Sequence, residues 1–211
     1  QETAVPLMHL VAAGFGFDVV TPTGAPAVIE EWSAPSKDEA VLGSAAACLE
    51  PDARDVDRAM TVTRSMRALV AGERLDAVTV RCFDLVTEDR TTGCLALSLL
   101  ADEGVPAGCE GDIPSMLALV WVWHLLGSTG WMANPSWIAP ERGELRLAHC
   151  TAPRSLGASY TLRSHFESGL GVAIGAALPP GAVTLVRIGG RDLKELWVVE
   201  GEVETSPLAA S

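Results

Sequence analysis

Asp84, Glu110 and Asn134 carry the side chains with the clearest potential for chemistry, because each follows a short apolar segment of the chain. Carboxylate and amide oxygens bind hard divalent cations, and a carboxylate also transfers protons. In an open parallel sheet, ligands bind beyond the carboxyl ends of the strands. If the three apolar segments are neighbouring strands, their terminal side chains converge at one edge of the sheet and build a site there.

Glu110 is the acid that is hardest to explain by a structural role alone. Asp112 lies just ahead of Pro114, which is typical of a helix N-cap, and Asp84 is placed to cap the loop that follows it. Glu110 stands between Cys109 and Gly111, where it caps nothing. An acid at a buried strand end is costly unless it is paired or bound to a cation. A catalytic or metal-binding role and a structural role for Glu110 both stay open at this point.

Two histidines lie near polar or glycine-containing turns. His149 stands in "LAHCTAP" and His165 in "RSHFESG". Either side chain is placed to face the predicted site, and a purely structural role stays open for both. The chain has no phosphate-binding loop, no GxSxG turn and no HExxH helix, so nucleotide binding, serine hydrolysis and zinc proteolysis lose their usual support.

The elements that must position these residues are predicted from hydrophobic periodicity and from turn and cap signals. Helices are predicted over residues 2–14, over 52–71 with Gly72 closing the helix, from Thr91 or Thr92 to Gly104, and from Asp112 to Gly127. Strands are predicted over residues 17–20, Ala77–Asp84, 105–110 and 130–135. Strands that alternate with helices through short connections indicate a parallel sheet with right-handed crossovers.

The pattern changes after about Arg142. Strand-like segments over residues 144–151, 170–178, 182–189 and 195–204 follow one another with turn residues between several of them, and one short helix is possible near Ala158–His165. The predicted fold is therefore α/β, a parallel βαβ sheet domain followed by a mostly antiparallel β domain. We place the boundary near residue 140, with a Rossmann-like α/β domain that carries the acidic site over 1–140 and a partial, β-rich C-terminal domain over 141–211.

Composition narrows the possible partners and the compartment. The net charge of −12 disfavours nucleic acid and anionic membrane as partners. The apolar run Met116–Trp123 is shorter than the roughly 20 residues that a membrane-spanning helix needs. The five cysteines form no CxxC pair, which favours reduced thiols and a cytoplasmic protein over a disulfide framework.

Several motifs in order resemble the L-fucose isomerase-like family, in its shorter sugar-isomerase branch. They are "GCLALSLLADEGVPAGCEGDIPSMLA", "MANPSWI", "LAHCTAP", "LRSHFESGLGVAIGAALPPGAVTLVRIGG" and "EGEV", which run from about Asp76 to Glu204. The resemblance implies an enzyme that converts an aldose such as L-fucose or L-arabinose into its ketose through an ene-diol. It also implies a divalent cation, Mn²⁺ or another such as Mg²⁺, held by two acids and one histidine, and a site formed between subunits of a homo-oligomer.

Carried onto this chain, the resemblance makes Glu110 a metal ligand and an acid–base catalyst, and it aligns the second acid with Asn134. An amide oxygen can ligate a cation but cannot act as a general base, so proton transfer falls to Glu110, to Asp84 or Asp112, or to water. His149, His165 and Trp137 are then expected to bind the sugar, Trp137 through its ring face. The motif that carries the family's ligand histidine does not occur here, so the chain is expected to be the middle and part of the C-terminal domain of such an enzyme.

Two other functions stay open. The chain could be a non-catalytic sugar-binding or assembly domain of isomerase ancestry, a reading that Asn134 and the missing histidine motif favour. It could also be another metal-dependent carbohydrate enzyme on the same scaffold, such as an epimerase.

Overall fold

The computed structural model describes residues 36–204 of the 211-residue chain. The helix predicted over residues 2–14 and the strand predicted over 17–20 lie outside the described residues. The helices are α2 (Ser36–Gly43), α3 (Ala53–Glu73), α4 (Cys82–Asp84), α5 (Cys94–Asp102) and α6 (Ile113–Leu126), with short turns η1 (Leu85–Asp89), η2 (Pro140–Arg142) and η3 (Arg154–Leu156). The strands are β1 (Ala47–Cys48), β2 (Val78–Thr79), β3 (Ala107–Gly108), β4 (Asn134–Ala139), β5 (Glu144–Ala148), β6 (Tyr160–Arg163), β7 (Ala173–Ala176), β8 (Gly181–Gly189) and β9 (Glu195–Val203).

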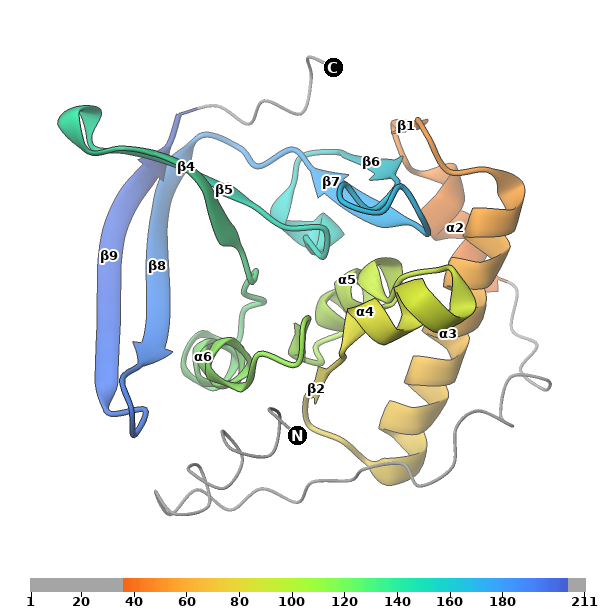
Figure 1. Ribbon diagram of the computed structural model, residues 1–211, viewed down its shortest axis with the longest axis horizontal. Coiled ribbons are helices and arrows are strands. Elements are labelled where there is room, and N and C mark those ends of the chain that lie inside the picture. Colours follow the sequence, from red (N-terminus) through yellow and green to blue (C-terminus); the bar gives the residue numbers. More distant parts are fainter. Residues whose placement is uncertain (1–35, 205–211) are drawn as a thin grey trace.

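The strands within residues 36–204 form several small sheets, some parallel and some antiparallel (Figure 1). β2 pairs with β3 in parallel, and β1 pairs in parallel with β6, which pairs antiparallel with β7. β4–β5 and β8–β9 are antiparallel hairpins. The predicted α/β class, with parallel pairing early and antiparallel pairing late, is confirmed.

Helix α5 is the centre of the core. All residues from Cys94 to Ala101 on this helix are buried. Leu95 and Leu99 pack into an apolar cluster with the β6–β7 region, whereas Leu97 and Leu100 pack into a second cluster with residues of β3 and α6. A helix that is apolar on all sides must be covered on all sides, which is why the sheets and helices gather around α5.

Helices α3 and α6 begin where the sequence predicted, and the expected N-cap role of Asp112 is confirmed. Asp52 forms a capping box with Asp55 at the start of α3, and the Asp112 carboxylate accepts a hydrogen bond from the Ser115 N–H at the start of α6. Gly127 ends α6 in the left-handed conformation, as expected for a C-cap glycine. The predicted stop of α3 at Gly72 is wrong, because the helix continues to Glu73 and ends at Arg74, which takes the left-handed conformation itself (φ 52°).

The strands before the site are shorter than predicted. The segment Ala77–Asp84 contributes only Val78–Thr79 to a strand, and Cys82–Asp84 turns into α4. β3 is likewise limited to Ala107–Gly108. These two strands pair only with each other over two registered positions, so the chain is free to leave the sheet directly after them.

The third predicted parallel strand is wrong. Residues 130–133 are not in a strand, and β4 begins at Asn134 and runs antiparallel to β5. A hairpin partner that follows within a few residues satisfies the backbone of β4 locally. The helix that seemed possible near Ala158–His165 is strand β6 instead, because it has β1 and β7 as neighbours.

The domain boundary near residue 140 stays a prediction. β1 pairs with β6 across this position, and one apolar cluster joins Met60 and Leu95 to Leu162 and Ile174. No helix in the described part of the chain is both long and apolar enough to cross a bilayer.

Candidate active site

Glu110 occupies the turn between β3 and α6, in a backbone conformation that side-chain-bearing residues avoid. Its φ is 63°, and that of Gly111 is 65°. The turn is held by two backbone hydrogen bonds, from the Gly111 N–H to the Val80 carbonyl and from the Asp112 N–H to the Cys109 carbonyl, each 3.1 Å. The left-handed conformation costs an L-residue about 1–2 kcal/mol, and such outliers gather at functional sites. This observation supports a functional role for Glu110.

His149 faces the Glu110 carboxylate. The His149 Nε2 atom lies 3.6 Å from Glu110 Oε1, with the imidazole side chain only 3% exposed and the carboxylate side chain 39% exposed. On the other side of the ring, Nδ1 lies 2.9 Å from the Thr151 hydroxyl oxygen. The imidazole is therefore buried and oriented from behind, and it presents one nitrogen to an acid that solvent and small molecules can reach.

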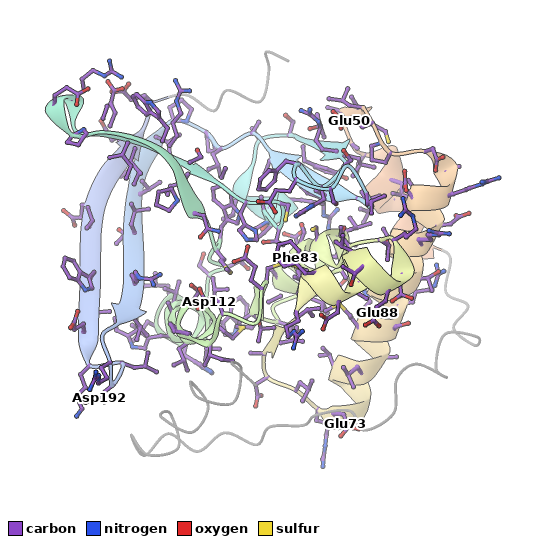
Figure 2. The ribbon with its side chains drawn as sticks, viewed as in Figure 1. Glu50, Glu73, Phe83, Glu88, Asp112 and Asp192 are labelled. Atoms are coloured by element: carbon purple, nitrogen blue, oxygen red, sulfur yellow. The ribbon has the colours of Figure 1, made fainter. Side chains whose placement is uncertain are left out.

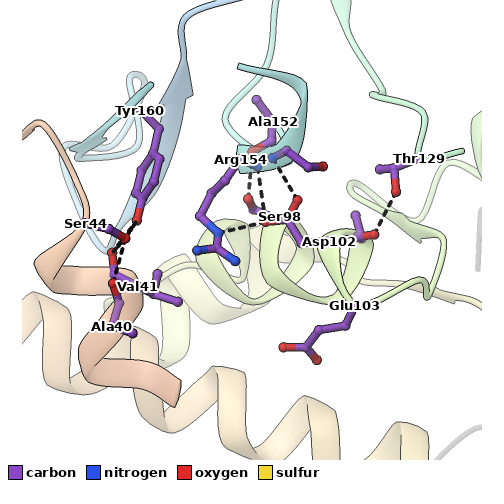
Figure 3. Close-up of polar contacts among 12 residues, drawn as sticks. Ala40, Val41, Ser44, Ser98, Asp102, Glu103, Thr129, Ala152, Arg154 and Tyr160 are labelled. Atoms are coloured by element: carbon purple, nitrogen blue, oxygen red, sulfur yellow. Dashed lines mark hydrogen bonds and ion pairs between the residues drawn. The ribbon is translucent and has the colours of Figure 1, made fainter. Parts of the chain in front are cut away.

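The segment that carries His149 is fastened to α5 (Figure 3). The Ser98 hydroxyl donates a hydrogen bond of 2.7 Å to the Ala152 carbonyl, and Arg154 Nε donates to Asp102 Oδ2 at 2.7 Å. The Asp102 carboxylate is nearly buried, at 7% exposure. A charge-assisted pair of this kind fixes geometry better than an exposed ion pair does, so residues 149–151 are held against the central helix.

Asn134 and Asp84 differ in their relation to this pair. Asn134 lies opposite Ala148 in the β4–β5 hairpin, so it stands beside the residue that precedes His149. Asp84 lies in α4 and forms an ion pair with Arg81 (Oδ1 to Nη2, 3.0 Å), with both side chains more than half exposed. The structure thus brings Glu110 and His149 into contact, places Asn134 near His149 in register, and leaves Asp84 with Arg81 on the surface.

Two arginine side chains lie against the Trp137 ring. The guanidinium carbons of Arg142 and Arg146 each lie 5.0 Å from its ring centroid. Both distances are within the range of cation–π attraction. Trp137 is therefore held by two arginines on the β4–β5 hairpin, toward the turn and away from Asn134 at the strand's start.

His165 lies in the interior, at 5% exposure, rather than on the surface beside Glu110. Its Nδ1 is 3.0 Å from the Ser168 hydroxyl, and its ring meets Phe83 edge to face with 6.4 Å between centroids. Figure 2 shows Phe83 near the middle of the view, on α4, where its side chain is 49% exposed. The sequence placed His165 correctly beside a turn, but its side chain points inward.

Buried thiols lie directly behind the Glu110–His149 pair. Cys109 precedes Glu110 and Cys150 follows His149, and their exposures are 1% and 6%. Hydrogen bonds from the Cys150 and Cys82 thiols lower the pKa of Cys109, against the opposing effect of burial. The same hydrogen bonds to the Cys109 sulfur raise the pKa of Cys82 and of Cys150. The cysteines are scattered along the sequence, so their spacing did not reveal that Cys82, Cys94, Cys109 and Cys150 meet.

The donors around Glu110 suit a hard or borderline divalent cation. A carboxylate oxygen and an imidazole nitrogen 3.6 Å apart can share one ion, and Asn134 offers an amide oxygen nearby in the strand register. The His149 Nε2 is free of hydrogen-bond partners other than Glu110 among the described residues, so it is available as a ligand. A small apolar pocket elsewhere, lined by Leu119 and Trp123 between α5 and α6, includes neither residue of the pair.

One curated protein with an isomerase name is similar to most of the chain. Sulfoquinovose isomerase of Alkalicoccus urumqiensis is 31% identical over 147 residues, which are 67% of this chain and 33% of that protein. The chain thus spans about a third of the length of this relative. The similarity supports a relationship with sugar isomerases in general, without singling out the L-fucose isomerase-like branch.

Two further similarities are short. A stretch of 43 residues, 20% of the chain, is 49% identical to the protein/nucleic acid deglycase HchA of Staphylococcus aureus strain MRSA252 and covers 15% of it. The same protein from strain bovine RF122 / ET3-1 is 51% identical over 41 residues. A match to a fifth of the chain does not assign a function to it. No family model matches the chain, and no solved structure does.

Proposed function

We propose that this chain carries the acid–base part of the active site of a divalent-cation-dependent aldose–ketose isomerase. The single observation that carries the proposal is the pairing of Glu110, in its left-handed turn after β3, with the buried His149. The similarity to sulfoquinovose isomerase supports the isomerase class. The motifs of the L-fucose isomerase-like family support the finer assignment to an ene-diol mechanism.

The chemistry needs a base beside a weakly acidic C–H bond. Glu110 removes the proton from C2 of the open-chain aldose, the electron pair of that bond forms the C1–C2 double bond, and the π pair of the C1=O bond moves to O1, which gains a proton to give the ene-diol. O2 then loses its proton as the C2=O double bond forms, and the C1–C2 π pair takes the proton that Glu110 returns to C1, which gives the ketose. Carboxylate bases placed in this way accelerate proton transfer by about 10²–10⁴-fold.

Mn²⁺ or another divalent ion such as Mg²⁺, when bound, supplies Lewis-acid stabilisation of the negative charge on the sugar oxygens. Glu110, His149 and Asn134 are the residues proposed to hold it. The Thr151 hydroxyl orients His149 through Nδ1, and residues behind a ligand in this way commonly set its direction and affinity.

The remaining site residues have supporting roles in the proposal. Asp84 is proposed as the second acid–base group, delivered by the α4 turn and restrained by Arg81. Trp137 is proposed to offer its indole to the sugar, and His165 to support the site from the interior. Asp84 is chosen because it follows β2, and β2 pairs with β3, the strand that precedes Glu110.

The test is ketose formation by the 211-residue chain with and without Mn²⁺, for the wild type and for Glu110→Gln. The amide keeps the size and polarity of the side chain but cannot accept a proton as a base, so the variant should lose activity by about 100-fold or more. Glu73→Gln is the matched control, because it makes the same chemical change at the far end of α3 (Figure 2). Full activity of Glu110→Gln would remove Glu110 from the mechanism.

The same assay separates the alternatives. Sugar binding with an affinity that EDTA does not change, and no turnover in the wild type, would support a non-catalytic sugar-binding or assembly domain instead. A product that remains an aldose but differs at one carbon would indicate an epimerase. A ketose that forms only with the divalent ion would support the isomerase.

The substrate is proposed to be a small neutral or anionic aldose. L-Fucose and L-arabinose follow from the family resemblance, and sulfoquinovose follows from the name of the similar isomerase. The three sugars should be compared as parallel substrates. Nucleic acid and anionic membrane are not proposed as partners, because the net charge of −12 repels both.

We also propose that the chain assembles into a homo-oligomer. Strand β9 leaves four consecutive large apolar side chains more than half exposed, namely Leu196, Trp197, Val198 and Val199. Contiguous exposed apolar surface of this kind commonly marks an interface. The particle mass from light scattering should correspond to more than one chain, and Trp197→Glu should shift that mass toward the monomer. A monomeric wild type would contradict this part of the proposal.

A further inference from the structure

Three buried side chains from separate segments meet behind the proposed active site. Cys94 is the first residue of α5, Cys150 follows β5, and His165 follows β6. Their exposures are 0%, 6% and 5%, and one ligand atom from each lies within 4.8 Å of the others. The Cys94 thiol donates to the Cys150 sulfur at 3.2 Å.

We propose that Cys94, Cys150 and His165 bind one thiophilic divalent ion of the zinc class, at a structural site distinct from the cation site of Glu110. Two thiolates and one imidazole form a donor set that selects zinc-like ions over Mn²⁺ or Mg²⁺, which prefer oxygen ligands. This inference does not rest on the isomerase activity, since it uses neither Glu110 nor His149, and His165 supports the proposed active site only from the interior.

The distances suit a metal better than a disulfide. Two Zn–S bonds of about 2.3 Å at a tetrahedral angle place the sulfurs about 3.8 Å apart. A disulfide requires a sulfur-to-sulfur distance of about 2.05 Å. The observed distance of 3.2 Å between the Cys94 and Cys150 sulfurs must therefore increase slightly when an ion binds. The buried imidazole beside the sulfurs is a third donor for which a disulfide has no use.

Ser168 holds His165 in the orientation that ligation needs. Its backbone N–H donates to the His165 Nδ1 at 3.3 Å, and its hydroxyl oxygen lies 3.0 Å from the same nitrogen. Nε2 has no hydrogen-bond partner among the described residues, and ligation through Nε2 requires the tautomer in which Nδ1 carries the proton and donates it to the Ser168 hydroxyl. Ligand histidines are typically held through their other ring nitrogen in this way.

Two unpaired hydroxyls just before Cys94 add an independent observation. The Oγ1 atoms of Thr91 and Thr92 are buried without a hydrogen-bond partner within residues 36–204. These residues were predicted to cap α5, but the N-cap position is Gly93, with no side-chain cap. Buried hydroxyls are almost always paired, so we expect a polar group beyond the described contacts near the start of α5.

The site would also brace the catalytic pair from behind. The His149 ring contacts Glu110, and the sulfur of the next residue, Cys150, accepts from the Cys94 thiol. A metal on Cys150 would tie the segment carrying His149 to α5 and to the turn after β6.

The test is a Co²⁺ titration of the metal-free, reduced 211-residue chain, followed in the optical spectrum and then by displacement with Zn²⁺. We expect one Co²⁺ per chain, sulfur-to-cobalt charge-transfer bands in the near ultraviolet, and an unchanged spectrum when Mn²⁺ is added. Cys94→Ser, Cys150→Ser and His165→Gln should each weaken binding by on the order of 100-fold, and Ser168→Ala by about 10-fold. Circular dichroism verifies that each variant is folded.

Two controls make the result specific. Cys48→Ser removes an exposed thiol outside the cluster and should bind Co²⁺ as the wild type does. Glu110→Gln should also keep the charge-transfer bands, so failure of the isomerase proposal leaves this test intact. Absence of the bands in the folded wild type, unchanged binding by folded His165→Gln, or a Cys94–Cys150 disulfide in place of metal would each overturn the inference.

Discussion

Replacing Glu110 by glycine should give a more stable protein than replacing it by alanine. Both changes remove the carboxylate and its contact with His149, so the comparison isolates the backbone. The φ of 63° costs alanine about 1–2 kcal/mol and costs glycine almost nothing. Glycine loses about 0.4–1 kcal/mol of this advantage through its greater freedom in the unfolded chain. The expected net difference is about 1 kcal/mol, which corresponds to about 2–4 °C in Tm for a domain of this size.

Thermal unfolding of the two variants, followed by circular dichroism, measures this difference. The same pair of substitutions at Glu73 is the matched control, because Glu73 is the last residue of α3 and has no positive φ. There glycine should be the less stable variant, by about 0.5–1 kcal/mol. An alanine variant at position 110 that melts at the same temperature as the glycine variant, or higher, would refute the strained turn.

Three further predictions concern the elements that carry the site. Leu97→Ala, at a fully buried position of α5, should lower the free energy of unfolding in urea by about 2–5 kcal/mol, and a loss below 1 kcal/mol would mean that the helix is not the centre of the core. Asp112→Ala removes the side-chain hydrogen bond from the Ser115 N–H and should lower the free energy of unfolding by about 0.5–2 kcal/mol, whereas Asp112→Asn should keep most of that stability. Equal free energies of unfolding for the alanine variant and the wild type would contradict the cap. The Arg163 side chain lowers the pKa of Glu50 below its ordinary value of 4.5. The stabilisation from this pair is therefore present above about pH 4.5 and is lost as the pH falls through the lowered pKa, so Glu50→Gln should flatten the acid limb of Tm against pH, and an unchanged limb would contradict it.

The elements that sequence predicted well carry their signals locally. Asp52 and Asp112 cap α3 and α6, and Gly127 ends α6, because a cap depends on a few adjacent residues. The segment after Val78–Thr79 was predicted as a continuing strand, since its apolar residues suit one. Strand length is decided by a partner distant in the chain, and β3 offers partners at only two positions.

The site was predictable in part for the same reason. Glu110 stood out as an acid without a capping role, a local property of "CEGD". The contact of Glu110 with His149 joins residues 39 positions apart through the β4–β5 hairpin, and the meeting of Cys94, Cys150 and His165 joins three separate segments. The expected convergence of Asn134 with two parallel strand ends depended on a third parallel strand, which the hairpin replaces.

Exchange of sugar hydrogen with solvent deuterium tests the central claim most directly. An aldose is incubated in D₂O with Mn²⁺ and the wild-type chain or Glu110→Gln, and deuterium at C1 and C2 is followed by NMR, with L-fucose, L-arabinose and sulfoquinovose in parallel. We expect incorporation by the wild type with at least one of these sugars, because the proton carried by the 39%-exposed Glu110 carboxylate exchanges with D₂O before it reaches C1, and a loss of about 100-fold or more in Glu110→Gln. Neither incorporation nor ketose with any of them in the wild type, or an equal rate in the variant, would contradict a proton-transfer isomerase built on Glu110 and His149.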